Sequence, residues 1–477
     1  MPTRSFASRP SRTRSAGWTQ HPARRSRRRT EPTAPSRGAS ELRDAALGVL
    51  SRNDVGGWTK PAPRLYPHQW SWDAAFIAIG LAHHDPDRGL REIEHLFEAQ
   101  WGDGRVPHIV FDPRVPDYWP GPDFWSSAAT SELAPRAPAT SGLIQPPMHA
   151  IAVWRILESA VGPERFHARV ARLYPKLLAW HRYLAERRDP EGTGLITVYH
   201  PWEGTDNTPR WDAALMRLTT KEIAPYTRTD TSLVEADERP TRAEYDCYIW
   251  LVEQLRGARY DDDAIQLAHP FLIKDVQCSA IFAAACASLE RIAEFVGATA
   301  AERTEIAAWR GRSAAAVTRA WDGELGLALD FDLRTRAPIR ASTSAGLAVL
   351  LLPGLDPALA DRAVATAFGP DFAGAAGLAF PVVLSTALRS PEFRPRTYWR
   401  GPTWPVVNWL LWWGLVEQGM VEPAADLRRA NLALLSRPAA RFAEYFEPFT
   451  GEPLGSPDQS WTAAVVLDWL STHTGSE

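Results

Sequence analysis

The chain has 477 residues, of which 45% are hydrophobic and 23% are charged, as in an ordinary folded globular protein. Three cysteines are too few for a disulfide framework or a zinc site, and the sequence contains no HExxH, CxxC or G-x-S-x-G motif. No stretch reaches about 18 uninterrupted apolar residues, so no membrane span is predicted.

The net charge of −3 is unevenly distributed along the chain. Residues 1–38 hold ten Arg and one Glu, which leaves 43 basic against 55 acidic residues, a net charge of −12, for the remainder. We do not expect such an acidic body to bind nucleic acid. The start lacks apolar periodicity, which predicts a disordered Arg-rich tail at 1–38 and one folded domain at 39–477. We expect a cytoplasmic protein without a metal or cofactor, and leave open whether it forms a homo-oligomer.

After the tail, apolar residues recur mainly at helical spacing, and strand-like alternation is sparse. The predicted helices are, in chain order, Glu41–Leu50, Ala74–Leu81, Leu90–Gln100, Met148–Ala160, Glu164–Glu186, Arg242–Leu255, Phe271–Val296, Ala300–Ala320, Ser344–Leu351, Pro357–Phe368, Thr403–Glu417, Ala424–Ser436 and Trp461–Ser471. The clearest of them is Phe271–Val296, a long apolar helix that Gly297 should end.

Long loops rich in Pro, Gly and aromatic residues separate the predicted helix pairs. Repeated helix pairs with elaborate loops predict an all-α (α/α)6 barrel, whose loops form a pocket at one mouth. The segment 217–241 is a long, polar and nearly structureless loop, and a loop of that length in a compact domain is either functional or disordered. We expect it to act as a lid that orders when substrate binds.

Two of these loops place carboxylates among aromatic and turn-forming residues, HPWEGTDNTPRWD at 200–212 and RFAEYFEP at 441–448. Further aromatic clusters lie in YPHQWSWD (66–73), YWPGPDFW (118–125) and YWRGPTWPVVN (398–408). Aromatic rings stack on the apolar faces of sugars, and hydrolysis of a glycosidic bond needs two carboxylates that flank it. The combination indicates a sugar-processing enzyme, although any single Trp fits a core position equally well.

The residues alone leave several roles open. Asp206 is suited to be a general acid if burial or a neighbouring carboxylate raises its pKa, and Trp202, Trp211 and Glu203 are candidates for both effects. The alternative is an Asp-Asn turn that caps a helix. In the second loop either Glu444 or Glu447 fits a catalytic base, and the other fits a cap or an ion pair.

At these motifs the chain resembles glycoside hydrolase family 63 over most of residues 40–475. YWRGPTWPVVN is close to that family's YWRGPxWPxxN signature, and EYFEPFTGEPLGSPDQSW and WEGTDNTPRWD resemble its two carboxylate segments. The compact length and TSGLIQPP at 140–147 are similar to its bacterial glucosylglycerate and mannosylglycerate hydrolases. One departure is that WEGTDN is a residue shorter before Asp206 than the usual WESGMDN.

The resemblance implies an (α/α)6 barrel and an inverting mechanism without a metal, with Asp206 as general acid and Glu444 as general base. It implies a glycerate carboxylate site at Arg239 and Tyr245, with Gln145 and Gln459 nearby. The sugar subsite that it implies consists of Tyr66, Trp70, Trp72, Asp73, Tyr118, Trp202, Tyr398, Trp399 and Trp404.

The sequence therefore predicts an inverting α-glycosidase for a small anionic α-glycoside, foremost glucosylglycerate or mannosylglycerate. One alternative is an α-glucosidase for neutral oligosaccharides or trehalose, and another is a non-catalytic sugar-binding protein. A helical interaction scaffold leaves the aromatic loops without an explanation.

Overall fold

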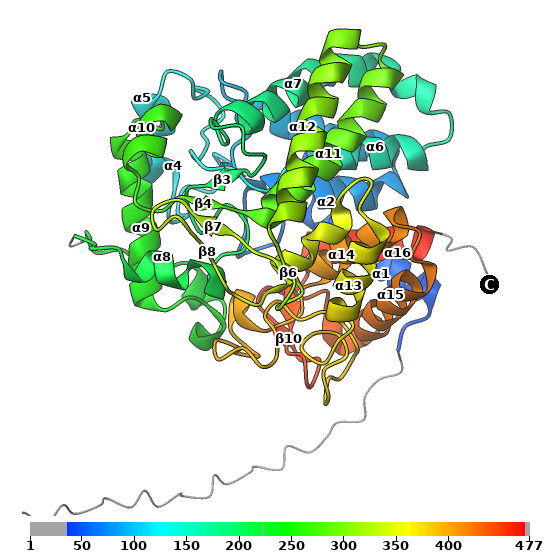
Figure 1. Ribbon diagram of the computed structural model, residues 1–477. Coiled ribbons are helices and arrows are strands. Elements are labelled where there is room, and N and C mark those ends of the chain that lie inside the picture. The colour runs from blue at the N-terminus through cyan, green and yellow to red at the C-terminus, as the bar shows by residue number, and fades with distance from the viewer. Residues whose placement is uncertain (1–35, 222, 473–477) are drawn as a thin grey trace, which may run out of the picture. The chain divides into compact units, whose positions relative to one another are not determined.

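The computed structural model describes residues 36–221 and 223–472, and Figure 1 shows their arrangement. Most of the predicted tail at 1–38 and residues 473–477 lie outside this range. The first helix, α1, spans Ala39–Asn53. The proposed division into a tail and one domain remains a prediction.

Six helices form a closed inner ring, in which each contacts the next and the last contacts the first. They are α2 (Ser71–Ala82), α6 (His149–Ser159), α11 (Val276–Phe295), the 3-10 helix η5 (Ser344–Leu351), α14 (Pro405–Glu417) and α16 (Ser460–Ser471). Every residue of α2 is buried, as expected of a helix that is surrounded on all sides. Gly80 of α2 permits close packing, because a Cβ there would lie 2.4 Å from the Ala464 Cα.

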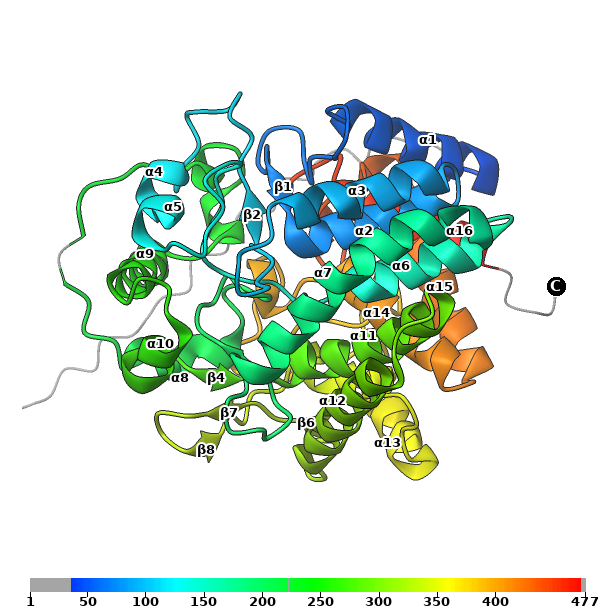
Figure 2. The same cartoon turned by 90° about the horizontal axis from the view of Figure 1, so that it is seen from above.

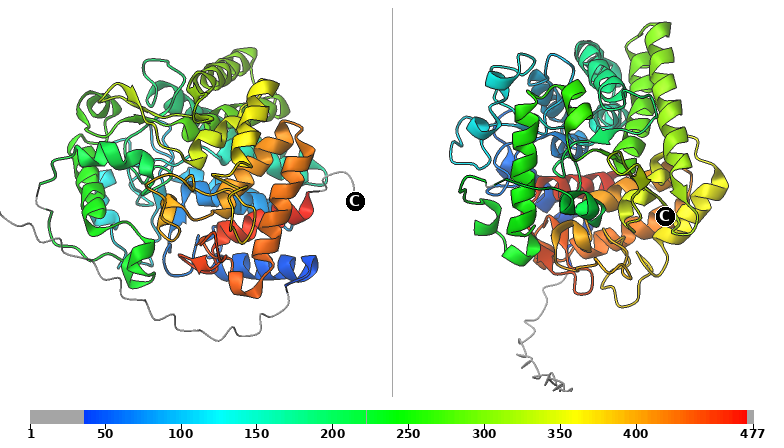
Figure 3. Two further views of the ribbon diagram at one scale, coloured as in Figure 1. Left: turned by 60° about the horizontal axis from the view of Figure 1, so that its bottom comes forward. Right: turned by 60° about the vertical axis from the view of Figure 1, so that its left-hand side comes forward.

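An outer layer of helices covers the ring. It consists of α1, α3 (Pro86–Glu98), α7 (His167–Glu186), α12 (Ala300–Arg319), α13 (Pro357–Ala367) and α15 (Val421–Leu435). Among the contacts between the layers, α3 packs on α2, α12 on α11, α13 on η5 and α15 on α14. The first and last helices of the described chain are in contact, since α1 packs on α16, which Figure 3 shows as blue beside red and orange segments. These layers make an (α/α)6 barrel.

Within the described part of the chain, α11 is the one helix that is long and apolar enough to cross a membrane. It belongs to the inner ring and is mostly buried there.

The remaining elements are short apart from the 16-residue helix α9 (Arg242–Gly257), and Figure 2 shows most of them gathered at one end of the helices. The helical ones are α4 (Pro122–Trp125), α5 (Ser127–Thr130), α8 (Asp212–Met216), α9 (Arg242–Gly257), α10 (Asp262–Ala268), η1 (Pro163–Phe166), η2 (Pro209–Trp211), η3 (Asp230–Ser232), η4 (Ala236–Glu238), η6 (Tyr398–Arg400) and η7 (Pro438–Ala440). The strands are β1 (Gln69–Trp70), β2 (Ile109–Val110), β3 (Thr197–Val198), β4 (Ile273–Lys274), β5 (Trp321–Asp322), β6 (Leu327–Ala328), β7 (Phe331–Asp332), β8 (Ala337–Pro338), β9 (Tyr445–Phe446) and β10 (Pro453–Leu454).

The strands pair in antiparallel fashion, and the largest sheet has the order β3-β4-β7-β8. This sheet corrects one predicted boundary. The helix expected at Phe271–Val296 begins at Val276, because Ile273 and Lys274 pair with β3 and β7 and Asp275 then caps the helix. Gly297 follows its end with a φ of +70°, as the sequence predicts.

Two other segments that were expected to be helical form 3-10 helices in the structure. The segment Ser344–Leu351 is a 3-10 helix, and the first turn of the helix expected at Glu164–Glu186 is the separate 3-10 turn η1. The described part of the 217–241 loop contains only η3 and η4. Its ordering on substrate binding remains a prediction.

Candidate active site

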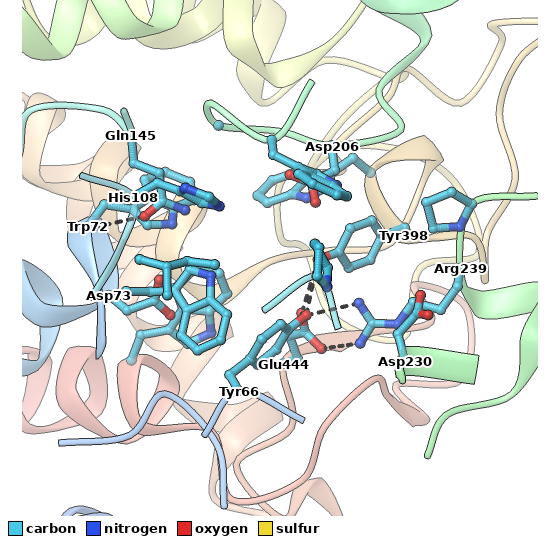
Figure 4. Close-up of a pocket in the computed structure, with 18 of the residues that line it drawn as sticks. Tyr66, Trp72, Asp73, His108, Gln145, Asp206, Asp230, Arg239, Tyr398 and Glu444 are labelled. Atoms are coloured by element: carbon cyan, nitrogen blue, oxygen red, sulfur yellow. Dashed lines mark hydrogen bonds and ion pairs between the residues drawn. The ribbon is translucent and has the colours of Figure 1, made fainter. Parts of the chain in front are cut away.

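A pocket opens at the loop-bearing end of the barrel, and Figure 4 shows residues that line it. It offers about 110 Å³ to the centres of water-sized molecules. At about 10–15 Å³ per water, roughly seven to eleven waters fit, equivalent to roughly 200–330 Å³ of liquid. The pocket therefore has room for a compact ligand. All predicted site residues except Trp404 line it, namely Tyr66, Trp70, Trp72, Asp73, Tyr118, Gln145, Trp202, Asp206, Arg239, Tyr245, Tyr398, Trp399, Glu444 and Gln459.

Helix starts and short strands bring these distant residues together. Pairing of β1 with β2 sets Trp70 opposite Ile109, and Asp73 lies in the first turn of α2. Gln459 and Trp404 are the N-cap residues of the inner helices α16 and α14. Because inner helices begin at this end of the ring, the residues around their first turns face one shared space.

Glu444 lies just before β9 and is held by four donors. Its Oε1 accepts hydrogen bonds from the Tyr66 hydroxyl at 2.7 Å and the Tyr398 hydroxyl at 3.4 Å. Its Oε2 accepts from Arg239 Nη2 at 2.7 Å and from the Ser456 backbone N–H at 3.1 Å. Burial raises the pKa of both tyrosines well above the ordinary value, so they remain protonated donors. This surrounding stabilises Glu444 as a carboxylate, the form that a base requires.

Glu447, the rival in the same loop, has a different role. Its Oε2 accepts from the backbone N–H groups of Phe449 and Thr450 and from the Thr450 hydroxyl at 2.6 Å. Glu447 does not line the pocket. The structure thus separates two glutamates that the loop sequence alone left equivalent.

The Arg239 guanidinium is paired with the Glu444 carboxylate. Besides Glu444, its guanidinium donates from Nη1 to the Tyr66 hydroxyl at 3.0 Å, and it lies 4.5 Å from the centre of the Tyr398 ring. Its Nε is buried and has no hydrogen-bond partner among the described residues. Arg239 can therefore neutralise Glu444 and still offer an N–H group to a ligand.

Asp206 is half-buried at the pocket surface, and Figure 4 shows it across the pocket from Glu444. Burial, more than any other cause, raises its pKa from 3.8 to about 8, and the charges of Glu444 and Asp230 raise it further. Backbone hydrogen bonding and Arg239 lower the pKa, without outweighing burial. Asp206 is therefore protonated near neutral pH, as a general acid must be. The shorter spacing of WEGTDN does not keep it out of the pocket.

The suggestion that Glu203 is the carboxylate that raises this pKa is wrong. Glu203 is completely buried and paired with Arg188, whose Nη1 and Nη2 donate at 2.8 and 2.7 Å. It also accepts from the backbone N–H groups of Ile144 and Tyr199. A carboxylate so fully satisfied fixes the loop before Asp206, and Glu444 and Asp230 supply the neighbouring charges in its place.

Gln459 and Asp73 are two further polar residues of the pocket. Gln459 is completely buried, and neither its Nε2 nor its Oε1 has a hydrogen-bond partner within the described chain. A buried polar group without a partner costs about 1–3 kcal/mol, so the Gln459 amide marks a position where a polar ligand would be favourable. Burial, together with the charges of Glu444 and Asp206, raises the pKa of Asp73 well above its ordinary value, although a backbone hydrogen bond lowers it.

His108 is a pocket residue that the sequence did not indicate. Its Nδ1 lies 2.5 Å from the Ser141 hydroxyl, which also accepts a hydrogen bond from the Ile109 N–H at 3.1 Å. The Ser141 hydroxyl has two lone pairs and one proton, so it can either donate to Nδ1 or accept from it. Burial lowers the pKa of His108 well below its ordinary value and keeps the ring neutral. The imidazole Nε2 can therefore act as a donor or an acceptor toward a bound ligand, according to the tautomer.

The sequence also missed the pocket residue Asp230, which accepts from Arg228 Nε and Nη2 at 3.0 and 2.6 Å. It lies in the polar 217–241 loop, where no aromatic pattern marks it. Trp404 is the opposite case, a predicted sugar-binding residue that does not line the pocket. It stacks flat on Trp399 at 3.7 Å, and its Nε1 donates to the Tyr398 carbonyl. Trp404 therefore supports the pocket wall from behind.

Among the residues that the structure describes, no cluster of three His, Cys, Asp or Glu side chains could hold a metal ion. The groups that line the pocket are carboxylates, phenols, amides, a guanidinium, an imidazole and aromatic faces.

Comparison with known proteins agrees with this chemistry. The family model for the mannosylglycerate hydrolase MGH1-like glycoside hydrolase domain matches residues 66–462. The chain is 44% identical to glucosylglycerate hydrolase of Mycolicibacterium hassiacum, over 92% of this chain and 100% of the relative. It is 38% identical to mannosylglycerate hydrolase of Rubrobacter radiotolerans, over 92% and 98%. A crystal structure of the GH63 mannosylglycerate hydrolase from Thermus thermophilus with Tris and D-glycerate matches with a TM-score of 0.82 and 38% identity, over 90% and 99%. The chain belongs to the family of MGH1-like glycoside hydrolases.

Proposed function

We propose that this enzyme hydrolyses the α-glycosidic bond of a small glycoside of glycerate, foremost glucosylglycerate, with inversion at the anomeric carbon. The main support for the proposal is that one pocket holds a protonated carboxyl group and an ionised one. Asp206 is held protonated while Glu444, across from it, is held as a carboxylate by four donors. An inverting glycosidase needs this pair of an acid and a base.

In the proposed reaction Asp206 donates its proton to the glycosidic oxygen as the bond to the anomeric carbon breaks. Glu444 removes a proton from a water molecule that attacks the same carbon from the opposite face. The products are the sugar with inverted configuration and glycerate. Asp206 ends deprotonated and Glu444 protonated, and exchange with solvent restores both.

The subsites follow from the placement of the polar groups. Asp73, Gln459 and His108 offer buried donors and acceptors to sugar hydroxyls. The carboxylate of glycerate is assigned to the free Nε side of Arg239, with Tyr245 and Gln145 nearby. The relatives named as hydrolases of glucosylglycerate and mannosylglycerate, and the neighbour crystallised with D-glycerate, support this assignment. The cytoplasmic location and the absence of a cofactor stay expectations from the sequence.

The test is to incubate the purified enzyme with glucosylglycerate, mannosylglycerate and trehalose and to follow the released sugar by NMR. We expect turnover of a glycerate glycoside, with the β-anomer as the first product. Turnover of trehalose alone would favour the neutral α-glucosidase. Binding without turnover would favour a sugar-binding protein, and an α-anomer as first product would contradict the inverting mechanism.

A further inference from the structure

A buried polar cluster lies outside the pocket, directly behind the loop that carries Asp206. Thr205, the residue before the acid, is buried and fixed at two atoms. Its hydroxyl accepts a hydrogen bond from Arg210 Nη2 at 2.6 Å. Its carbonyl accepts from Trp211 Nε1 at 2.9 Å. The backbone next to the acid is therefore held from the side away from the pocket.

The other end of this contact is the start of the inner helix α11. Arg210 Nη1 donates to Asp275 at 3.0 Å and to Asp330 at 2.7 Å. Asp275 is the N-cap of α11 and accepts from the Cys278 N–H, and Asp330 accepts from the Val276 N–H. Arg210 thus joins the acid loop to the start of the inner helix α11.

The composition of this cluster is unusual for a purely structural contact. Arg210, Asp275 and Asp330 are almost completely buried, and none of them lines the pocket. A buried ion pair is weak as a source of stability, because desolvation of the charges offsets much of their attraction. What such a cluster provides is a fixed geometry. A misplacement of about 1 Å in a catalytic group costs roughly a hundredfold in rate.

We propose that Arg210 is a positioning residue for the general acid, and that it acts through the Thr205 hydroxyl. By this contact the start of α11 fixes the direction in which the Asp206 carboxyl meets the glycosidic oxygen. The proposal rests on the proposed function, in which Asp206 is the acid. It predicts a defect in proton donation, with sugar binding and the base left intact.

The first variant is Thr205→Val, which removes the hydroxyl and keeps the shape of the side chain. Thr208→Val is the matched control, because Thr208 is buried in the same loop and its hydroxyl makes no hydrogen bond within the described residues. Each variant is assayed on the glycerate glycoside and on the α-glycosyl fluoride of the same sugar. Fluoride leaves with little help from an acid, yet its release still needs the base and the sugar subsite.

We expect Thr205→Val to lower kcat on the glycoside about tenfold or more, a share of the roughly 10²–10⁴-fold that general acid–base catalysis contributes. On the fluoride kcat should change less than about twofold, because departure of fluoride needs little acid catalysis, and Thr208→Val should change neither rate by more than that. A second variant, Arg210→Lys, keeps the charge but loses the fork that spans both aspartates and Thr205, and should show the same split. Equal losses on both substrates, or no loss on either, would overturn the proposal.

Asp206→Asn separates this proposal from the proposed function. If Asp206 is the acid, that variant loses the glycoside reaction and keeps the fluoride reaction. A variant that keeps the glycoside reaction would refute the assignment of the acid itself. A second readout does not depend on the fluoride: the alkaline limb of kcat/KM should shift in Thr205→Val and stay unchanged in Thr208→Val.

Discussion

Replacement of Asp206 by Asn should make the protein more stable while it abolishes the reaction. The carboxyl has a pKa of 3.8 when unfolded and about 8 in the folded protein. Between these values folding requires the carboxyl to take up a proton, so the free energy of unfolding falls as the pH rises from about 4 to 8. At pH 7 the gap is about 3 pKa units, which at 1.36 kcal/mol per unit corresponds to a penalty of up to about 4 kcal/mol. Asn carries no charge, so the variant does not bear this penalty.

The assay is equilibrium urea unfolding of both proteins at pH 5 and pH 7. The stability advantage of Asp206→Asn should grow by about 2.7 kcal/mol between the two pH values, at about 1.4 kcal/mol per unit. Asp263→Asn is the control, because the Asp263 side chain is 82% exposed and should give no such dependence. An advantage that is the same at both pH values would show that Asp206 is not held protonated. The alkaline limb of kcat/KM in the unmodified enzyme should then also be absent near pH 8.

The remaining predictions concern neighbours of the two carboxylates. Arg239→Gln should lower kcat on neutral and anionic glycosides alike, because Glu444 loses its ion pair at 2.7 Å. Glycerate glycosides should show a further loss in kcat/KM. A loss confined to glycerate glycosides would contradict a catalytic role for the Arg239–Glu444 pair. His108→Asn should reduce kcat/KM about tenfold, near the worth of one hydrogen bond, and Ser141→Ala should reduce it less, because Ser141 contacts the ring and does not line the pocket; a larger effect of Ser141→Ala than of His108→Asn would refute a direct contact between His108 and the ligand. Glu203→Gln should destabilise the protein by about 3–5 kcal/mol in thermal or urea unfolding, because it leaves Arg188 buried without its partner. The alkaline limb of the pH profile of kcat/KM should not shift in this variant. A shift would show that the charge of Glu203 does raise the pKa of Asp206.

Local signals in the sequence were sufficient for most of the helices. Helical periodicity and capping residues act within a few positions, so α3, α9 and α12 could be located from their apolar faces and their Asp or Thr caps. Where a long-range pairing competes with the local pattern, the sequence was misleading. The pairing of β4 with β3 and β7 delays the start of α11 in this way.

The loop motifs, read with the family resemblance, gave nearly all of the pocket. Aromatic residues beside carboxylates in loops are rarely needed for packing, and so they mark a binding site even without a structure. The exceptions are residues without a local signal. His108 lies in an ordinary apolar strand segment, and Asp230 lies in a polar loop. Trp404 belongs to an aromatic loop motif, but it stacks behind Trp399 and does not line the pocket.

By itself the sequence determined the helical class, the approximate positions of most helices and the loops that line the pocket, since these depend on neighbours along the chain. Only the tertiary structure decided the charge states and the partners. Arg239 meets Glu444 across 205 positions, and Glu203 is neutralised by Arg188 instead of tuning Asp206. Such pairings depend on closure of the helical ring, which brings distant loops together, and on burial, which sets the pKa of Asp206.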